Sequence, residues 1–187
     1  NFNNTIFAAR GEKIFSSAST EIARGSTNSI AQGTAMTGSG TITVKNTTGF
    51  SSSGTIQIDS ELFTYTGKTA TTFTGITRAT SGTSAAAHTA STDNSRTVVS
   101  ESWTERDNSR SGAEKYAFER FNFDGNEKIV CVDGDNAPVV FNTSFSATDV
   151  SASSVAGASI VTAFRNHMFY AGMSSTPQEV IFSVPFD

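Results

Sequence analysis

The chain has 187 residues, a formal net charge of −4, 36% hydrophobic residues and one cysteine, Cys131. Its mild acidity provides no basic stripe, which argues against binding of duplex nucleic acid by counterion release. A lone cysteine excludes an intrachain disulfide and a zinc site with paired thiolates, and it fits a reducing cytoplasm. The longest apolar runs have about five residues, far fewer than the roughly 20 that a membrane helix needs, so we expect no membrane insertion.

Serine and threonine make up more than a quarter of the residues, whereas charged residues make up only 16%. Branched threonine fits a pleated sheet, and the scarcity of lysine and glutamate argues against long exposed helices. The 15 phenylalanines supply much of the available core and argue against disorder. The composition therefore predicts an all-β fold.

Residues 1–40 predict an N-terminal arm and connector. Asn1–Arg10 carries one apolar cluster and would form an arm or an edge strand. Ser16–Gly40 is rich in Ser, Thr, Ala and Gly, and its best helical window, Ser19–Ala23, is too short to stand alone. Because a connector of this length is unusual inside a compact domain, we expect it to pack on another subunit.

Residues 41–92 predict a small β module. Apolar and polar side chains alternate in successive short runs, at Ile42 and Val44, at Ile56 and Ile58, at Leu62 or Phe63 with Tyr65, and around Phe73 and Ile76. A period of two places every second side chain on one face, which is typical of half-buried antiparallel strands. About four strands in roughly fifty residues make a small antiparallel β-barrel or sandwich, near the lower size limit for independent folding.

Residues 93–115 are polar and charged and predict a linker, and residues 116–187 predict a β-meander. Turn signals separate its runs, at Asp124-Gly125, Asp133–Asn136 and Arg165–His167. Successive strands joined by short turns form a propeller blade or an open barrel, so this part is a candidate start of a β-propeller. The last predicted strand, Glu179–Val184, has no closing turn. We therefore expect either a longer polypeptide or a strand completed by a neighbouring subunit.

Asp59 and Glu61 are the first candidates for chemistry. Two residues apart on a strand, they share a face and could hold a cation or act as a carboxylate pair. Glycoside hydrolysis, however, needs two carboxyls in a cleft that holds a sugar, and no cluster of Trp or Tyr surrounds them in the sequence. We prefer the interpretation in which Asp59 closes a turn and Glu61 is a polar strand residue.

Two further patterns resemble known sites only superficially. Asp133–Asn136 has glycine at the second position and lacks the glutamate of an EF-hand calcium loop, which favours a hairpin turn. Gly67-Lys68 lacks the upstream glycine and the following helix of a P-loop, so nucleotide binding has no support.

His88 and His167 are the only histidines. The sequence has no G-x-S-x-G elbow for a serine triad, and we predict that each histidine forms hydrogen bonds at the surface beside a turn. Arg78 is predicted to hold the loop Thr80–Ala87, through backbone carbonyls or Glu61. We predict no catalytic residue, no cofactor-binding residue and no metal ligand.

Two parts of the chain resemble structural proteins of tailed bacteriophages. Gly54–Gly67 (GTIQIDSELFTYTG), Phe73–Arg78 (FTGITR) and Gly82–His88 (GTSAAAH) are similar to a β module of phage virion proteins, those of cyanophages and other marine phages among them. The second half is similar to the opening of propeller-like tail subunits, in Tyr116–Phe123, Val132–Pro138, Arg165–Gly172 and Phe182–Asp187. A full propeller would need far more chain than follows Tyr116.

This resemblance implies an oligomeric, non-enzymatic tail protein of the nozzle or tube-associated kind, made in the host cytoplasm and incorporated into the virion. Its implied partners are copies of itself and other tail proteins. Mild acidity and few lysines suit a surface that DNA passes without specific binding. One alternative is a receptor- or glycan-binding module of a tail fibre, with a host surface receptor as partner and Tyr65 as the module's sugar-stacking candidate. Another is a cell-wall hydrolase that uses Asp59, Glu61, Asp133 or His88.

Overall fold

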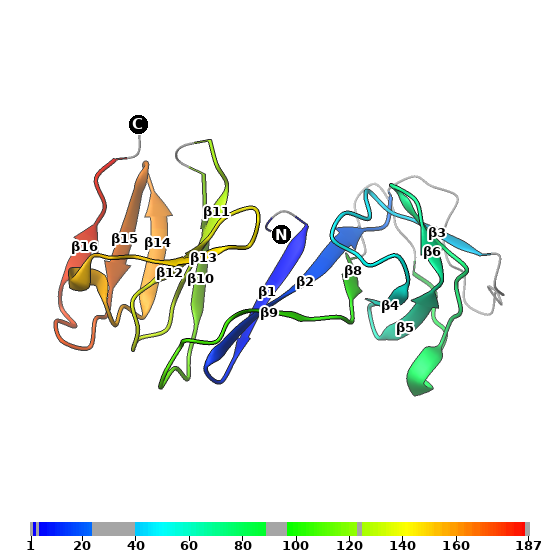
Figure 1. Ribbon diagram of the computed structural model, residues 1–187, viewed down its shortest axis with the longest axis horizontal. Coiled ribbons are helices and arrows are strands. Elements are labelled where there is room, and N and C mark those ends of the chain that lie inside the picture. The colour runs from blue at the N-terminus through cyan, green and yellow to red at the C-terminus, as the bar shows by residue number, and fades with distance from the viewer. Residues whose placement is uncertain (1, 3, 24–39, 89–96, 123–124, 186–187) are drawn as a thin grey trace. The chain divides into compact units, whose positions relative to one another are not determined.

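The computed structural model describes residues 2, 4–23, 40–88, 97–122 and 125–185 (Figure 1). Within these ranges the regular structure consists of β-strands and two 3-10 turns, η1 (Thr80–Gly82) and η2 (Ser153–Val155). All the strand pairs for which a register is defined are antiparallel, which confirms the predicted all-β class. Neither helical turn is long and apolar enough to cross a membrane.

The chain divides into two compact units. Unit 1 contains residues 1, 3–6 and 17–104, and unit 2 contains residues 2, 7–16 and 105–187. The boundary passes through three strands, β1 (Thr5–Arg10), β2 (Lys13–Glu21) and β9 (Thr104–Asp107). The predicted module over residues 41–92 lies in unit 1, and the predicted meander over residues 116–187 lies in unit 2.

Strand β2 (Lys13–Glu21) lies within residues 1–40, for which an arm and a connector were predicted. The prediction of a connector is therefore wrong for the part that β2 covers. Apart from Ile14, the buried positions of this strand carry serine and threonine in place of large apolar residues; Ser17, for example, is buried and its hydroxyl donates to the Ser100 carbonyl at 2.7 Å. Because periodicity is read from apolar side chains, a strand that buries small hydroxyls gives no signal. Residues 24–39 of the predicted connector lie outside the described residues.

Two open sheets contribute strands to unit 1, although most residues of β1 and β9 belong to unit 2. The larger sheet has the order β1-β2-β8-β4-β5, with β9 paired to β2. The smaller has the order β3-β7-β6. Neither closes into a barrel, so of the two forms predicted for this module, barrel or sandwich, the barrel is wrong. Its strands are β3 (Thr41–Thr43), β4 (Gly54–Ile58), β5 (Glu61–Tyr65), β6 (Gly67–Lys68), β7 (Thr72–Thr74) and β8 (Thr97–Ser100).

The core of unit 1 confirms the predicted alternation. Ile56 and Ile58 of β4 and Phe63 of β5 are fully buried, whereas Leu62 is only half-buried. These side chains pack in one cluster with residues of the smaller sheet, including Ile42 and Phe73. Strands that point alternate side chains at a shared core explain why a period of two was visible in the sequence.

Unit 2 contains two meanders, which confirms the predicted topology. The first has the order β10-β11-β12-β13 and the second β14-β15-β16, so every strand pairs with its neighbour in sequence. The strands are β10 (Ala117–Phe121), β11 (Lys128–Val132), β12 (Val139–Phe141), β13 (Ala147–Asp149), β14 (Ile160–Phe164), β15 (His167–Ala171) and β16 (Val180–Phe182).

The four-stranded sheet of unit 2 is covered on both faces. Val130 and Val132 of β11 point into a cluster shared with the second meander, through residues such as Met168. Ile129 and Cys131, which alternate with them, point into a second cluster with Phe7 and other residues of the N-terminal part. The continuous apolar run of β11 therefore reflects burial on two sides.

Two of the turns predicted from the sequence are present at the expected residues. Arg165 and Asn166 both have positive φ, 46° and 62°, and join β14 to β15 as a two-residue turn. Asp59 has φ 52° in the turn between β4 and β5, which confirms its predicted position. Of the predicted Asp124-Gly125 turn, Asp124 lies outside the described residues.

Candidate functional site

A buried charge cluster in unit 1 brings the first sequence candidates together. Glu61 opens β5 and is fully buried. Arg78, which follows β7, donates to it from Nε at 2.8 Å and from Nη2 at 2.7 Å. A guanidinium that meets a carboxylate through two parallel hydrogen bonds is a strong and geometrically specific pair. Both oxygens of the Glu61 carboxylate therefore accept a hydrogen bond from Arg78.

His88 completes this cluster from the far end of the following loop. Its Nδ1 lies 2.8 Å from Asp59 Oδ2 and its Nε2 lies 2.9 Å from Glu61 Oε2. The imidazole is 1% exposed and packs edge-on against the Phe63 ring. The predicted surface position of His88 is therefore wrong, because Phe63 and two carboxylates bury it on three sides.

The cluster holds the loop between Arg78 and His88. Arg78 Nη2 donates to the Ala86 carbonyl, and the backbone N–H groups of Ala79 and Ala86 donate to Glu61 at 3.2 and 2.9 Å. Leu62 N–H donates to the Thr83 hydroxyl at 3.1 Å. These bonds confirm the predicted role of Arg78 as the residue that holds this loop. They also engage both Glu61 oxygens in contacts within the fold.

The electrostatics of Glu61 follow from these contacts. Burial alone would raise the pKa of its carboxyl, but hydrogen bonds from Arg78, the Ala86 N–H and His88, with the charge of Arg78, outweigh burial and lower the pKa from 4.5 to about 2. Since the folded pKa lies below the unfolded one, the ionised carboxyl stabilises unit 1 above about pH 4.5. That contribution is lost as the pH falls through 2.

This shift can be measured directly. We expect the Glu61 side-chain carboxyl to stay ionised until about pH 2, because protonation would break its pairing with Arg78. Selective ¹³C labelling of glutamate and an acid titration by NMR would follow its carboxyl resonance. A Glu61 midpoint close to the ordinary glutamate value of 4.5 would contradict the assignment.

A second charge cluster, in unit 2, was missed by the sequence analysis. Arg110 is 2% exposed and donates from Nη2 to the Ala137 carbonyl at 2.8 Å. Its guanidinium lies 3.2 Å from Asp133, 3.5 Å from Asp149 and 3.6 Å from Asp107. The carboxylates come from three separate segments, so nothing in their spacing signals a common partner.

Asp133 also closes the turn predicted for Asp133–Asn136. Its Oδ1 accepts from the N–H groups of Asp135 and Asn136 at 3.0 and 2.8 Å, and Gly134 adopts φ 87°. A side chain that accepts from the backbone two and three residues ahead forms an Asx-type turn. Within the described residues, no group of three or more His, Cys, Asp or Glu side chains is suited to hold a metal ion.

Cys131 is buried in unit 2 and carries a free thiol. Burial, together with the charge of Asp133, raises the pKa of this thiol to about 12. Because the thiolate is the reactive form, we expect Cys131 to react with Ellman's reagent at least ~100-fold more slowly in the folded chain than in urea. Fast labelling of the folded chain would contradict its burial.

The remaining sequence candidates have structural contacts. Tyr65 is 3% exposed and its hydroxyl donates to the Ser51 carbonyl at 2.9 Å, so its ring is not free to stack on a sugar. Lys68 Nζ donates to the Thr47 carbonyl at 2.9 Å. His167 is half-buried, with Nδ1 2.6 Å from the Ser183 carbonyl.

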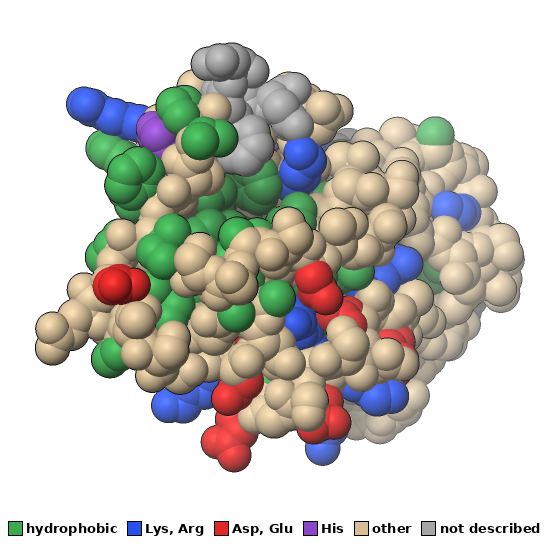
Figure 2. Space-filling view, turned by 60° about the vertical axis from the view of Figure 1, so that its left-hand side comes forward, with side chains coloured by type: hydrophobic (Ala, Val, Ile, Leu, Met, Phe, Trp, Pro, Cys, Tyr) green, Lys and Arg blue, Asp and Glu red, His purple; other side chains and the backbone are tan. Residues whose placement is uncertain are grey.

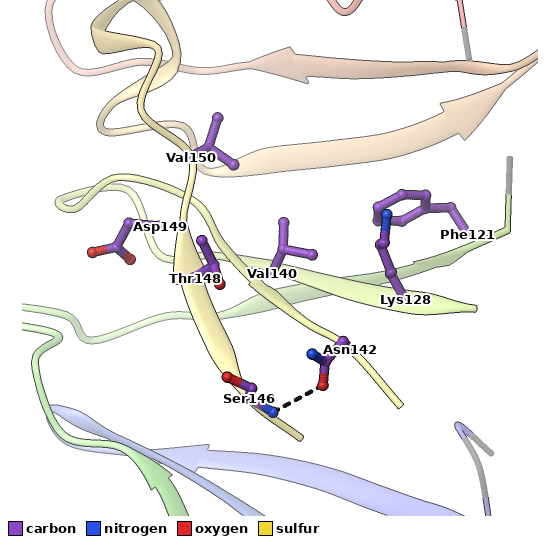
Figure 3. Close-up of a pocket in the computed structure, with 8 residues that line it drawn as sticks. All are labelled: Phe121, Lys128, Val140, Asn142, Ser146, Thr148, Asp149 and Val150. Atoms are coloured by element: carbon purple, nitrogen blue, oxygen red, sulfur yellow. Dashed lines mark hydrogen bonds between the residues drawn. The ribbon is translucent and has the colours of Figure 1, made fainter. Parts of the chain in front are cut away.

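Unit 2 has a concavity over its four-stranded sheet (Figure 3). Phe121, Lys128 and Val140 project from β10, β11 and β12 into a space of about 350 Å³. Asn142 and Ser146 lie at one end of it and are joined by a 3.1 Å hydrogen bond. An adjoining cavity of about 290 Å³ shares Phe121 and Val140 and is mostly apolar. Neither lining includes a nucleophile paired with a base.

Most of the strongly exposed large hydrophobic residues that the structure describes lie on or beside the β14-β15-β16 sheet. Five of the six large hydrophobic residues that are strongly exposed belong to this sheet or directly follow it, Ile160, Phe164, Val180, Phe182 and Val184. They are 57–79% exposed. Hydrophobic side chains gather around a histidine in the upper left of Figure 2. We call these five residues the apolar face.

Contacts between aromatic rings hold side chains of the apolar face in place. His167 and Phe169 of β15 lie between its edges, and Phe182 packs 5.7 Å from the His167 ring and 5.8 Å from the Phe169 ring. The Arg165 guanidinium lies 5.4 Å from the centre of the Phe164 ring. Contiguous apolar patches rimmed by polar groups mark surfaces that bind other molecules. In the sequence, these residues look like ordinary strand hydrophobics.

No protein-family model, no curated protein and no solved structure matches the chain. The class that the fold itself defines is an all-β protein of two units with an exposed apolar sheet face.

Proposed function

We propose that the chain is a non-enzymatic structural protein of a tailed-bacteriophage virion, a tail component that assembles with copies of itself and with other tail proteins. The observation that carries the assembly role is the apolar face, which a solvated monomer would expose at a cost in hydration. The virion context is taken only from the sequence resemblance of Gly54–Gly67 and of Arg165–Gly172 to phage structural proteins.

The residues of the two charge clusters contact one another and the backbone, which supports a structural role for the chain. Glu61, Arg78 and His88 bind one another and the loop between them, and Arg110 binds three aspartates and a backbone carbonyl. Each cluster stiffens a polar part of the fold by pairing its buried charges, through hydrogen bonds around Glu61 and mainly through ion pairs around Arg110. A chain that builds a particle needs this kind of rigidity.

The two meanders of unit 2 support a finer proposal, that they are blades of a β-propeller. Propeller blades are antiparallel meanders of four strands, and β10–β13 form such a meander. The second meander, β14–β16, packs against the first through the cluster that contains Val130 and Met168. We assign β10–β13 as one blade and β14–β16 as part of another.

Cryo-electron microscopy of purified virions from the phage that encodes the chain tests the proposal, with mass spectrometry of the same particles. We expect the chain in the particles and its strands in density of the tail. Its absence from the particles, with the chain found only in the infected-cell lysate, would overturn the proposal.

A further inference from the structure

We infer that a second copy of this chain covers the apolar face, in a two-fold arrangement that brings Arg165 of each copy to Glu179 of the other. This inference rests on the proposed self-assembly and names the surface and the partner. Three properties of the β14-β15-β16 sheet carry it: the direction of its side chains, the area they expose and the placement of its charges.

The side chains of this sheet sort strictly into two faces. Val161, Met168, Tyr170 and Ile181 belong to or pack on the interior cluster of unit 2. Their neighbours in sequence point the opposite way, because successive side chains of a strand alternate. The exposed residues Ile160, Phe164, Val180 and Phe182 all fall in this outward set.

The exposed area is close to what half of a protein interface requires. If a large apolar side chain offers roughly 200 Å² when free, the five residues of the apolar face expose on the order of 600 Å². A standard interface buries about 800 Å² on each partner, including a polar rim. The apolar face together with a polar rim therefore has about the area that one partner buries in a standard interface.

Charge placement indicates which partner fits. Arg165 lies in the turn that joins β14 to β15, beside the Phe164–His167 pair. Glu179 directly precedes β16, whose first residue, Val180, pairs with Ala171 at the other end of the sheet. Arg165 and Glu179 are both exposed. One end of the face is therefore basic and aromatic, and the other is acidic and aliphatic.

Such a face is complementary to itself when the strands of two copies run in opposite directions. A two-fold axis between the sheets and perpendicular to the strands places the Phe164 end of one copy over the Ile160 end of the other. The same operation brings Arg165 to Glu179 twice. This contact closes on itself, so it pairs two copies; a ring would need another, head-to-tail surface in addition.

Sedimentation equilibrium of the 187-residue chain tests this arrangement through charge reversal. We expect the wild-type chain to form a dimer, and R165E or E179R each to weaken dimerisation by about tenfold or more, because two attractive contacts become repulsive. The double variant R165E/E179R restores the attraction with its signs exchanged, and we expect its affinity within about threefold of the wild type. A wild-type monomer at all concentrations, or a double variant as weak as the single ones, would overturn the inference.

Phe164→Ser provides an independent variant, since its side chain is 59% exposed and its loss should not affect folding. We expect it to abolish the dimer while Trp103→Ser, at an exposed aromatic of unit 1, leaves the dimer unchanged. Circular dichroism verifies the fold of each variant. Failure of these tests removes the two-fold contact alone, whereas absence of the chain from virions removes the proposed function.

Discussion

Glu61→Gln lowers the free energy of unfolding of unit 1 by about 3–5 kcal/mol, because it leaves the buried Arg78 charge without its counter-ion. The Arg78 side chain is 5% exposed, so water cannot replace the lost carboxylate. Trp103 is the only tryptophan and lies in unit 1, so its fluorescence in a urea titration reports the unfolding of this unit.

Two variants make the result specific. Glu101→Gln carries the same chemical change at an exposed site of the same unit and should alter the free energy of unfolding by about 0.5 kcal/mol or less. Glu61→Gln combined with Arg78→Met removes both charges while keeping an oxygen acceptor for the loop N–H groups, and it should recover part of the loss, since paired buried charges are often replaceable together. A loss below about 1 kcal/mol for Glu61→Gln would contradict the structural role of the cluster.

Arg110→Met destabilises unit 2 by about 3–5 kcal/mol, because Asp133 and Asp107 then remain buried without a cation between them. Methionine keeps much of the length and apolar stem of the arginine side chain. Cys131, buried in the same unit, reports opening through its rate of thiol labelling. A loss of about 3 kcal/mol accelerates labelling more than 100-fold when closing is faster than reaction.

Arg120→Met is the matched control for this experiment. Arg120 is 56% exposed and pairs with Glu127 at 3.3 Å near the surface. Exposed pairs contribute little, so we expect labelling of Cys131 to change by less than about threefold. Equal acceleration in Arg110→Met and Arg120→Met would show that Arg110 has no special role.

Much of the fold could be predicted because strand periodicity is local. Ile56 with Ile58, and Phe63 with Tyr65, alternate with polar residues and do point into one core. Strand β2 was missed because hydroxyl side chains such as Ser17 fill all but one of its buried positions, the exception being Ile14. Periodicity measures hydrophobicity, and a strand can bury serine when the backbone accepts its hydrogen bond.

The polar clusters were predictable only in part. Arg78 follows Glu61 by only 17 residues, and an isolated bridge between Thr64 and Thr77 brings the two segments together, so their pairing could be predicted from nearby sequence. The burial of His88 and the meeting of Arg110 with Asp107, Asp133 and Asp149 depend on how distant segments fold back. A single sequence carries no record of such contacts.

The apolar face was hidden for a related reason. Phe164 and Phe182 have the same character as the core residues Phe63 and Phe141, and only the packing of the sheet tells which of them face solvent. Periodicity shows that a strand has two faces and not whether both are covered. The structure supplies that second fact.

Hydroxyl-radical footprinting tests most directly whether the apolar face is the assembly surface. The chain is oxidised while dilute and again at a concentration where copies associate, and the modified side chains are quantified by mass spectrometry. We expect oxidation of Phe164 and Phe182 to fall several-fold on association, while exposed Trp103 of unit 1 stays equally reactive. Phe164 and Phe182 that remain as reactive as Trp103 in the associated chain would contradict the assignment of this face to self-assembly.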